Sequence, residues 1–265
     1  MSRETSNIGV QRIIEKQMRA WELQKSQRPA EPRSPECRIH SFVAISRMAG
    51  SEGSQIAQMV GQRLRRPVFD KELFDHIASS PEARQRMADL VDERDVGWFE
   101  EILWPLTTGT RSSGRHDYFR KLCEAVVAVA QQGPAVFLGR GVAMILPQSV
   151  GLRVKIVASR ERCLARFAET RHIETAEAET RLERIEHDRN AFLSAHFTSR
   201  ALRGDYNDLT INTDRVSVEM AVELIAKAAV LKEASETEDA GALPVRSSPT
   251  SPGRPSSSHP QADRD

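Results

Sequence analysis

Apolar residues along the middle of the chain follow two different spacings. Short, nearly continuous apolar runs predict buried strands, whereas apolar residues three and four positions apart predict one face of a helix. The predicted strands lie at Phe42–Ser46, within Arg65–Leu73, and at Ala135–Leu138, Leu152–Val157 and Asp208–Thr213. Helical patterns separate these five runs, and such alternation indicates a parallel sheet covered by helices on both faces. We therefore expect an α/β fold with a five-stranded parallel sheet.

The N-terminal segment, residues 1–26, carries apolar residues at helical spacing among charged ones, and an amphipathic helix is expected there. Its apolar stripe consists of Val10, Ile13, Ile14, Met18 and Trp21. The stripe has to be buried, either on the domain's own surface or on the second subunit of a homodimer. A helix on a membrane surface is disfavoured because acidic side chains lie among the basic ones.

Two further segments do not read as parts of the domain. Residues 27–39 contain three prolines and are expected to form an extended linker. Residues 232–265 are rich in serine, proline and charge, and they cannot bury enough apolar surface to fold. The folded domain is therefore expected over residues 40–231, followed by a disordered tail.

The first strand passes into a helix through a small, glycine-containing turn, within Phe42–Ala57. This is the setting of a phosphate-binding loop, in which backbone N–H groups and the positive end of a helix converge on an anion. The usual sequence G-x-x-x-x-G-K-[ST] is not met. With Ser54 in the hydroxyl position, Gly53 stands where the lysine should be, Glu52 replaces the second glycine and Arg47 the first. A phosphate loop without lysine and an ordinary strand-to-helix turn both remain open.

Two charged residues follow predicted strands. Asp70 comes at the carboxyl end of the second strand, where open α/β sheets place their ligands. It is a candidate for a magnesium-shell or acceptor contact, and also for the N-cap of the next helix. Arg140 lies between Gly139 and Gly141, where a cation can approach an anion closely. A surface arginine in a turn is the alternative.

Further arginines lie on two predicted helices after the fourth strand. Arg162 and Arg166 are four positions apart and share a helical face. Arg184 and Arg189 lie in a long charged helix at 176–197. Because the guanidinium group binds phosphate through a fork of fixed donors, this set is typical of a clamp over polyphosphate. A solvated charged helix is the other interpretation.

Composition narrows the class of protein further. The chain has 265 residues and a net charge of +1, so nothing in its overall charge points to nucleic acid. Its three cysteines are far apart, without a C-x-x-C pair, which indicates neither a zinc site nor a disulfide framework. No apolar run is long enough to span a membrane. A cytoplasmic protein is expected.

Four blocks occur in an order that resembles the cytidylate kinase-like proteins, relatives of bacterial cytidylate kinase. They are Ile45–Arg47 with Gly50, Ser51, Gly53, Ile56 and Ala57; Phe69–Leu73; Gly139–Gly141; and Tyr206–Thr213. The resemblance covers roughly residues 40 to 230. It implies a P-loop kinase fold, ATP with Mg²⁺ as the phosphoryl donor, and a nucleoside monophosphate, by name CMP or dCMP, as the acceptor.

The resemblance also implies roles for individual residues. The loop residues that would cradle the donor phosphates are Gly50, Ser51, Glu52, Gly53, Ser54 and Gln55. Ser54 would ligate magnesium, and Asp70 would orient the acceptor or a metal-bound water. The cations that would neutralise the transferring group are Arg47, Arg140, Arg162 and Arg166, with the lid arginines Arg184 and Arg189.

The chain also departs from authentic cytidylate kinases. Those enzymes carry a G-K-[ST] loop and an Asp-Gly-Arg-Asp sequence, where this chain has Glu52–Ser54 and Leu138–Gly141. The missing lysine, together with an anion in an anion-binding loop, favours a second interpretation: a nucleotide-binding regulatory module without turnover. A third is a structural protein that keeps the fold and binds no nucleotide.

Overall fold

The computed structural model describes residues 39–79, 114–197 and 206–242. The predicted N-terminal helix at 1–26, nearly all of the linker at 27–39, and the tail beyond residue 242 lie outside the described residues. The same holds for residues 80–113 and 198–205.

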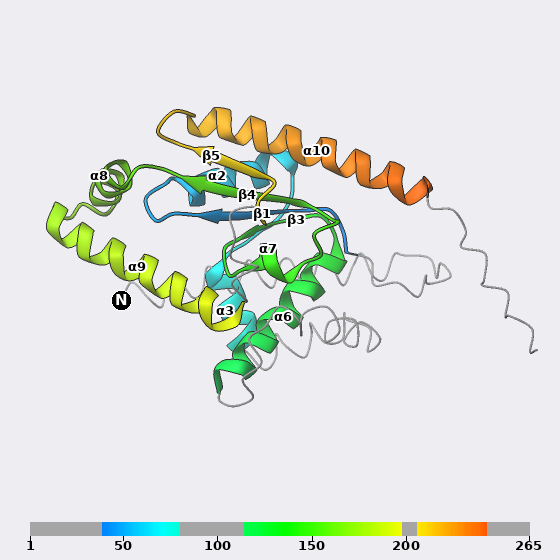
Figure 1. Cartoon of the computed structure of the whole chain (residues 1–265), viewed down its shortest axis with the longest axis horizontal. Helices are drawn as coiled ribbons and strands as arrows, with labels where there is room; N and C mark the ends of the chain where they lie inside the picture. The colour runs from blue at the N-terminus through cyan, green and yellow to red at the C-terminus, as the bar shows by residue number, and fades with distance from the viewer. Residues whose placement is uncertain (1–38, 80–113, 198–205, 243–265) are drawn as a thin grey trace, which may run out of the picture.

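The described residues form one five-stranded sheet, in which every neighbouring pair of strands is parallel. The strands are β1 (Phe42–Arg47), β2 (Val68–Phe69), β3 (Ala135–Leu138), β4 (Leu152–Val157) and β5 (Leu209–Asn212). Their order across the sheet is β2-β3-β1-β4-β5, with β1 in the centre (Figure 1). The predicted α/β fold with a five-stranded parallel sheet is confirmed.

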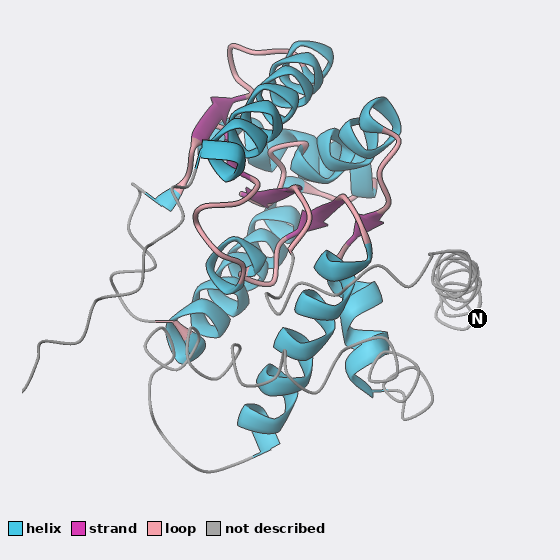
Figure 2. Ribbon diagram, turned by 90° about the vertical axis from the view of Figure 1, so that its right-hand side faces the viewer, coloured by secondary structure: helices cyan, strands magenta, loops and turns pink. Residues whose placement is uncertain are grey.

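Helices lie on both sides of this sheet (Figure 2). In chain order they are α2 (Gly53–Leu64), α3 (Lys71–Ser79), α6 (Gly114–Gln132), α7 (Val142–Ile145), α8 (Arg160–Arg171), α9 (Thr175–His196) and α10 (Val218–Ala242). Helices α2 and α10 cover one face, and α3, α6 and α7 contribute to the core on the other. The crossovers between parallel strands require this arrangement.

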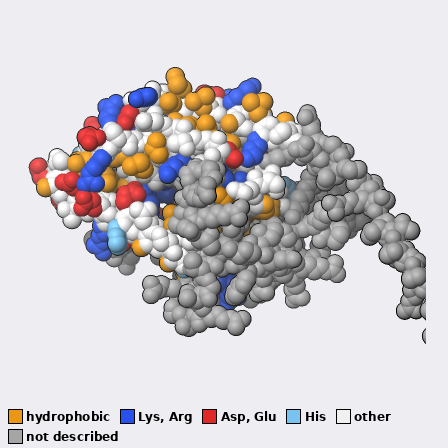
Figure 3. All heavy atoms as spheres, viewed as in Figure 1, with side chains coloured by type: hydrophobic (Ala, Val, Ile, Leu, Met, Phe, Trp, Pro, Cys, Tyr) orange, Lys and Arg blue, Asp and Glu red, His pale blue; other side chains and the backbone are white. Residues whose placement is uncertain are grey.

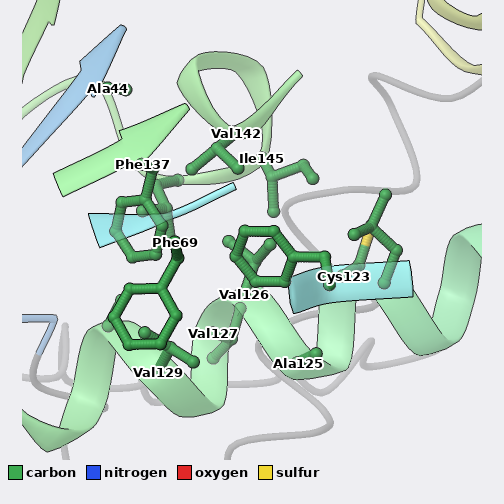
Figure 4. Close-up of a cluster of buried hydrophobic side chains, with 14 of the residues drawn as sticks. Ala44, Phe69, Cys123, Ala125, Val126, Val127, Val129, Phe137, Val142 and Ile145 are labelled. Carbon is green, nitrogen blue, oxygen red and sulfur yellow. The ribbon is translucent and has the colours of Figure 1, made fainter. Parts of the chain in front are cut away.

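The alternation of side chains in β1 divides the core into two halves. Phe42 and Ala44 are buried with α6 and α7, whereas Val43 and Ile45 are buried with α2 and α10. In the first half Phe69 and Phe137 have ring centroids 5.8 Å apart, and they face the buried residues of α6 (Figure 4). Because both faces of the sheet are covered, β1 is apolar along most of its length, as its sequence predicts.

Arg153 in β4 is an exception, since it is charged and yet only 1% exposed. Its guanidinium group donates to the carbonyl oxygens of Ala143 at 2.9 Å and Leu146 at 3.0 Å, and also to that of Pro147. The buried charge is thus satisfied by backbone acceptors. These bonds hold the segment between α7 and β4, next to the Gly139–Gly141 turn.

The C-terminal boundary of the domain has to be corrected. The tail was predicted to begin at residue 232, but α10 continues to Ala242. Lys232 lies 2.9 Å from a carboxylate oxygen of Asp208, and Arg66 lies 2.7 Å from one of Glu233. These ion pairs tie polar residues to the domain, so their polarity did not mark the end of the fold. None of the helices in the described ranges has the length and apolar content needed to cross a membrane.

Candidate active site

The loop between β1 and α2 is shaped by two close approaches of backbone and side chain. Gly50 has φ +79°, and a Cβ there would lie 2.2 Å from the carbonyl oxygen of Cys163 in α8. A Cβ at Gly53 would lie 2.4 Å from Cβ of Arg47. A side chain at position 53 would therefore overlap the side chain at position 47, and glycine avoids this overlap.

The first turn of α2 presents open backbone donors. Glu52 occupies the N-cap with φ 61° and makes no side-chain capping bond, and the N–H of Ile56 donates to its carbonyl oxygen at 3.0 Å. The N–H groups of Gly53, Ser54 and Gln55 precede that bond and have no partner within the helix. The Ser54 side chain is exposed on this turn. The arrangement can receive an anion.

Ser51 is placed differently from Ser54. It is fully buried, and its hydroxyl donates to the carbonyl oxygen of Met48 at 2.8 Å. Thr213, at the end of β5, donates from its hydroxyl to the carbonyl oxygen of Ser51 at 3.3 Å. The N–H of Ser51 also donates to the carbonyl oxygen of Met48, at 3.4 Å, so both the side chain and the backbone of Ser51 stabilise the loop.

Arg47, the last residue of β1, extends towards the end of β3. A Cβ at Gly139 would lie 2.3 Å from Nη1 of Arg47, so the guanidinium group lies against that glycine. Its Nε is buried and has no hydrogen-bond partner among the described residues. Burial and the neighbouring charge of Arg189 lower the pKa of Arg47 to about 10, against the opposing influence of Asp70 and Glu186. Such a group favours the approach of an anion.

Arg140 is held in place by three helices. It has φ 54° between Gly139 at 79° and Gly141 at 68°. Its Nη2 donates to both carboxylate oxygens of Asp75 in α3, at 2.6 and 2.7 Å. The guanidinium carbon lies 5.7 Å from the ring centroid of Tyr118 in α6 and 5.1 Å from that of Phe192 in α9. Arg140 is therefore a cation fixed by its neighbours, and the alternative of a surface arginine in a turn does not describe it.

Tyr118 completes this cluster. Its hydroxyl donates to Asp75 at 2.5 Å, and burial raises the pKa of Tyr118, with this hydrogen bond as the second cause. The phenol thus stays protonated and keeps the Asp75 carboxylate directed at Arg140. Neither Asp75 nor Tyr118 was named as a site residue from the sequence. Their common partner is Arg140, which lies 65 residues from Asp75 in the chain, so sequence spacing did not indicate the cluster.

A cavity of about 520 Å³ lies beside these residues. Its five cationic lining residues are Arg47, Lys71, Arg140, Lys155 and Arg189. Two acids, Glu186 and Asp188, also line it, and Met144, Phe192, Leu193 and Tyr206 contribute apolar surface. The volume is within the usual range for a small-molecule site, and the charge favours an anionic ligand. Lys71 and Lys155 were missed; the lysine inside the apolar strand Leu152–Val157 was a usable signal.

Helix α9 joins the cavity to the β1–α2 loop. Nη1 of Arg189 donates to the carbonyl oxygen of Arg47 at 3.0 Å and to Oε1 of Glu186 at 2.8 Å. The same Oε1 accepts the N–H of Ala49 at 2.5 Å. Arg189 therefore lies beside the β1–α2 loop and lines the cavity. Glu186 was missed, although its spacing from Arg189 is typical of a helical ion pair.

The predicted arginines of α8 are not directed at an open site. Nη2 of Arg166 lies 2.9 Å from Glu52 and donates to the carbonyl oxygen of Thr213 at 3.0 Å, so Arg166 already has an internal anion. Arg162 is exposed, with its Nε 4.0 Å from Asp214. The carboxylate of Glu52 thus faces α8 and is neutralised there.

Arg184 lies on the solvent side of α9. It is exposed and does not belong to the cavity lining. Its surroundings are rich in exposed charges such as Arg160, which pairs with Glu179 at 2.9 Å. In Figure 3 acidic and basic side chains gather at the end of the molecule formed by α8 and α9. Arg184 thus lies on a solvated face of α9, whereas Arg189 lines the cavity.

Asp70 acts as the N-cap of α3. Its Oδ1 accepts the N–H of Leu73 at 3.1 Å, which is the helix-cap alternative of the sequence. Its charge also acts on Arg47, whose pKa it raises. Within the described ranges no group of three or more His, Cys, Asp and Glu side chains is placed to hold a metal ion.

Three comparisons relate the chain to known proteins. The cytidylate kinase-like family matches residues 42–215. No curated protein matches the chain. Among solved structures, an uncharacterized protein from Eubacterium ventriosum ATCC 27560 has a TM-score of 0.51 at 17% identity, over 72% of this chain and 99% of its own.

Two other solved structures are more distant. Shikimate kinase from Bacteroides thetaiotaomicron has a TM-score of 0.40 at 13% identity, over 71% of this chain and 97% of its own. A gluconokinase from Sinorhizobium meliloti 1021 has a TM-score of 0.34 at 13% identity, over 77% of this chain and 97% of its own. The family match includes the β1–α2 loop, the Gly139–Gly141 turn and α9.

Proposed function

The chain belongs to the cytidylate kinase-like family and has the P-loop kinase fold, and we propose that it transfers a phosphoryl group from ATP to a nucleoside monophosphate. The observation that carries this proposal is the position of Arg47. Its Cβ adjoins Gly53 at the start of α2, and its guanidinium group adjoins Gly139 beside the cavity. One cation thus connects the open helix N-terminus with the cationic cavity.

The two ends of this arrangement suit the two substrates. The open amides at the start of α2, with those of the loop from Gly50 to Gln55, would bind the donor's β-phosphate. Arg140, fixed by Asp75, would bind the phosphate of the acceptor in the cavity. Arg47 and Arg189 lie between these places and would neutralise charge on the transferring group.

Phosphoryl transfer asks little covalent chemistry of the protein, because positioning and charge neutralisation supply most of the catalysis. The attacking atom is already a phosphate oxygen, so no strong general base is required. The charge that a loop lysine usually contributes would come from Arg47, whose place beside Gly53 excludes such a lysine. Arg189 adds a second cation from α9.

A magnesium ion fits these residues if the substrates supply most of its ligands, as they commonly do for this ion. The Ser54 hydroxyl, which is exposed at the start of α2, would be a direct ligand. Asp70 follows β2, which β3 separates from β1, and one of its oxygens already caps α3. Asp70 would therefore hold a metal-bound water. The ion would shield the negative charge between donor and acceptor phosphates.

The acceptor that we propose is CMP or dCMP, on the strength of the family alone. A coupled assay of ADP release with ATP, Mg²⁺ and each common nucleoside monophosphate tests both levels of the proposal. Turnover that depends on CMP or dCMP supports the full proposal. Turnover with another monophosphate corrects the acceptor and keeps the reaction, whereas no ADP release with any acceptor contradicts the kinase function.

The ion pair between Glu52 and Arg166 favours a second candidate, a module that binds a nucleotide without turnover. The pair places an anion at the edge of the phosphate loop and engages a cation proposed for the donor. Calorimetry with ATP and CMP separates the two candidates. Binding without ADP release in the coupled assay supports the module, and binding with ADP release supports the kinase.

A further inference from the structure

Helix α9 is fastened to the phosphate loop by one carboxylate. Oε1 of Glu186 accepts the N–H of Ala49 at 2.5 Å and a donor of Arg189 at 2.8 Å. Arg189 in turn donates to the carbonyl oxygen of Arg47 at 3.0 Å. Helix α9 runs past the end of the sheet at which β1 leads into α2 (Figure 1). The contacts join residues 137 and 142 positions apart, so they depend on the fold.

Glu186 also acts on two cations that repel each other. Arg189 lowers the pKa of Arg47, and Glu186 raises it. Nε of Arg47 is buried without a hydrogen-bond partner in the described part of the chain. All three residues line the cavity, so this charge faces the space for a ligand. The Glu186 carboxylate reduces the repulsion between the two arginines but accepts no hydrogen bond from Nε of Arg47.

We propose that Glu186 is the internal counter-ion of the Arg47–Arg189 pair, and that a phosphate group of the substrate takes over this role on binding. Carboxylate and phosphate oxygens accept charge-assisted bonds from guanidinium groups in the same way. The inference rests on the phosphoryl-transfer site proposed above. Glu186 acts as a positioning residue, since it fastens Arg189 and the Ala49 amide and does not touch the reacting atoms.

Two substitutions separate its charge from its hydrogen bonds. Glu186→Gln keeps an oxygen that accepts from the Ala49 amide and removes the competing anion. Pyrophosphate, measured by calorimetry on the full chain, should then bind about tenfold more tightly, because one nearby negative charge is gone. Glu186→Ala also removes the acceptor. Backbone hydrogen exchange in residues 47–51 should then be about tenfold faster than in Glu186→Gln, because the loop loses its bond to α9.

Glu183→Gln is the matched control. Glu183 lies on the same helix, is exposed, and pairs with Arg160 at 2.6 Å, which also has Glu179 as a partner. This variant should leave pyrophosphate affinity and loop exchange unchanged. The proposal is overturned if Glu186→Gln binds pyrophosphate no more tightly than the parent chain, or if no variant binds it. It is also overturned if Glu186→Ala exchanges like Glu186→Gln.

These measurements need no turnover. A chain that releases no ADP with any acceptor, yet shows the expected pyrophosphate and exchange results, contradicts the kinase function and supports the counter-ion. A chain that turns over but shows unchanged pyrophosphate affinity in Glu186→Gln supports the kinase function and contradicts the counter-ion.

Discussion

Arg47 occupies the space that a side chain at Gly53 would need, since a Cβ at Gly53 would lie 2.4 Å from Cβ of Arg47. The two positions that depart from the usual phosphate loop are therefore coupled. The arginine excludes the lysine, and the glycine makes room for the arginine.

Gly53→Ala should destabilise the chain by about 2 kcal/mol, because the added methyl group overpacks against Arg47. Combined with Arg47→Gly, which removes the Cβ and Cγ that the new methyl group would meet, the same substitution should cost much less. Chemical denaturation of the two single variants and the double variant measures this coupling as a double-mutant cycle. Additive losses would show that the two side-chain positions do not compete for space.

Ser54→Ala and Arg140→Ala should each lower kinase turnover at least tenfold, which corresponds to ~1.4 kcal/mol in the barrier. The first removes the proposed magnesium ligand, and the second removes the cation that Asp75 holds in the cavity. Steady-state kinetics measure the turnover of each variant, and melting temperatures check that each variant is folded. Arg160→Ala, an exposed arginine on α8, is the control and should keep its turnover. Unchanged turnover in both test variants would contradict the roles proposed for Ser54 and Arg140 in phosphoryl transfer.

Glu52→Gly and Glu52→Gln should both bind ATP more tightly than the parent chain, because each frees Arg166 from its ion pair. They differ in backbone strain. Glu52 has φ 61°, and glycine adopts this conformation without the cost of ~1 kcal/mol that a side chain brings. Glu52→Gly should therefore be the more stable of the two in chemical denaturation. Weaker ATP binding in both variants would mean that Glu52 helps to shape the donor site.

Cys163 should be unreactive towards iodoacetamide at pH 8 in the folded protein. Burial raises the pKa of its thiol, although the charge of Arg166 acts in the opposite direction. Little of the reactive thiolate is therefore present at pH 8. Gly50→Ala should make it reactive, because a Cβ at Gly50 meets the carbonyl oxygen of Cys163 at 2.2 Å and α8 has to move. Peptide mass spectrometry locates the modified thiol. Equal labelling of both proteins at Cys163 would contradict the close packing of α8 on the loop.

The fold was predictable because its strands are buried on both faces. A strand such as Ala135–Leu138 is apolar at every position, and the glycine-rich turn after it is equally visible. The carboxyl ends of parallel strands meet at one edge of a sheet, and Arg47 and Arg140, which follow two such strands, both line the cavity there. The end of the domain was misjudged because α10 is polar there and is tied to the domain by ion pairs such as Lys232–Asp208.

The partners of these arginines were not predictable in the same way. Asp75, Tyr118 and Glu186 lie on helices whose charged residues read as solvated faces. Equally, Arg184 and Arg189 look alike in the sequence, but only Arg189 lines the cavity. The direction in which a helical side chain points depends on how the helix crosses the sheet, which its own sequence does not specify.

The sequence by itself determined the sheet, the loop without lysine and the cations at the strand ends, because apolar periodicity and glycine placement are local properties. The tertiary structure decided which charges meet. It paired Glu52 with Arg166 and Asp75 with Arg140, and it brought the local Glu186–Arg189 pair of α9 against the N–H of Ala49. These contacts join residues far apart in the chain and depend on how α3, α8 and α9 pack around the end of the sheet, where a cation's neighbours determine whether it is free to bind phosphate.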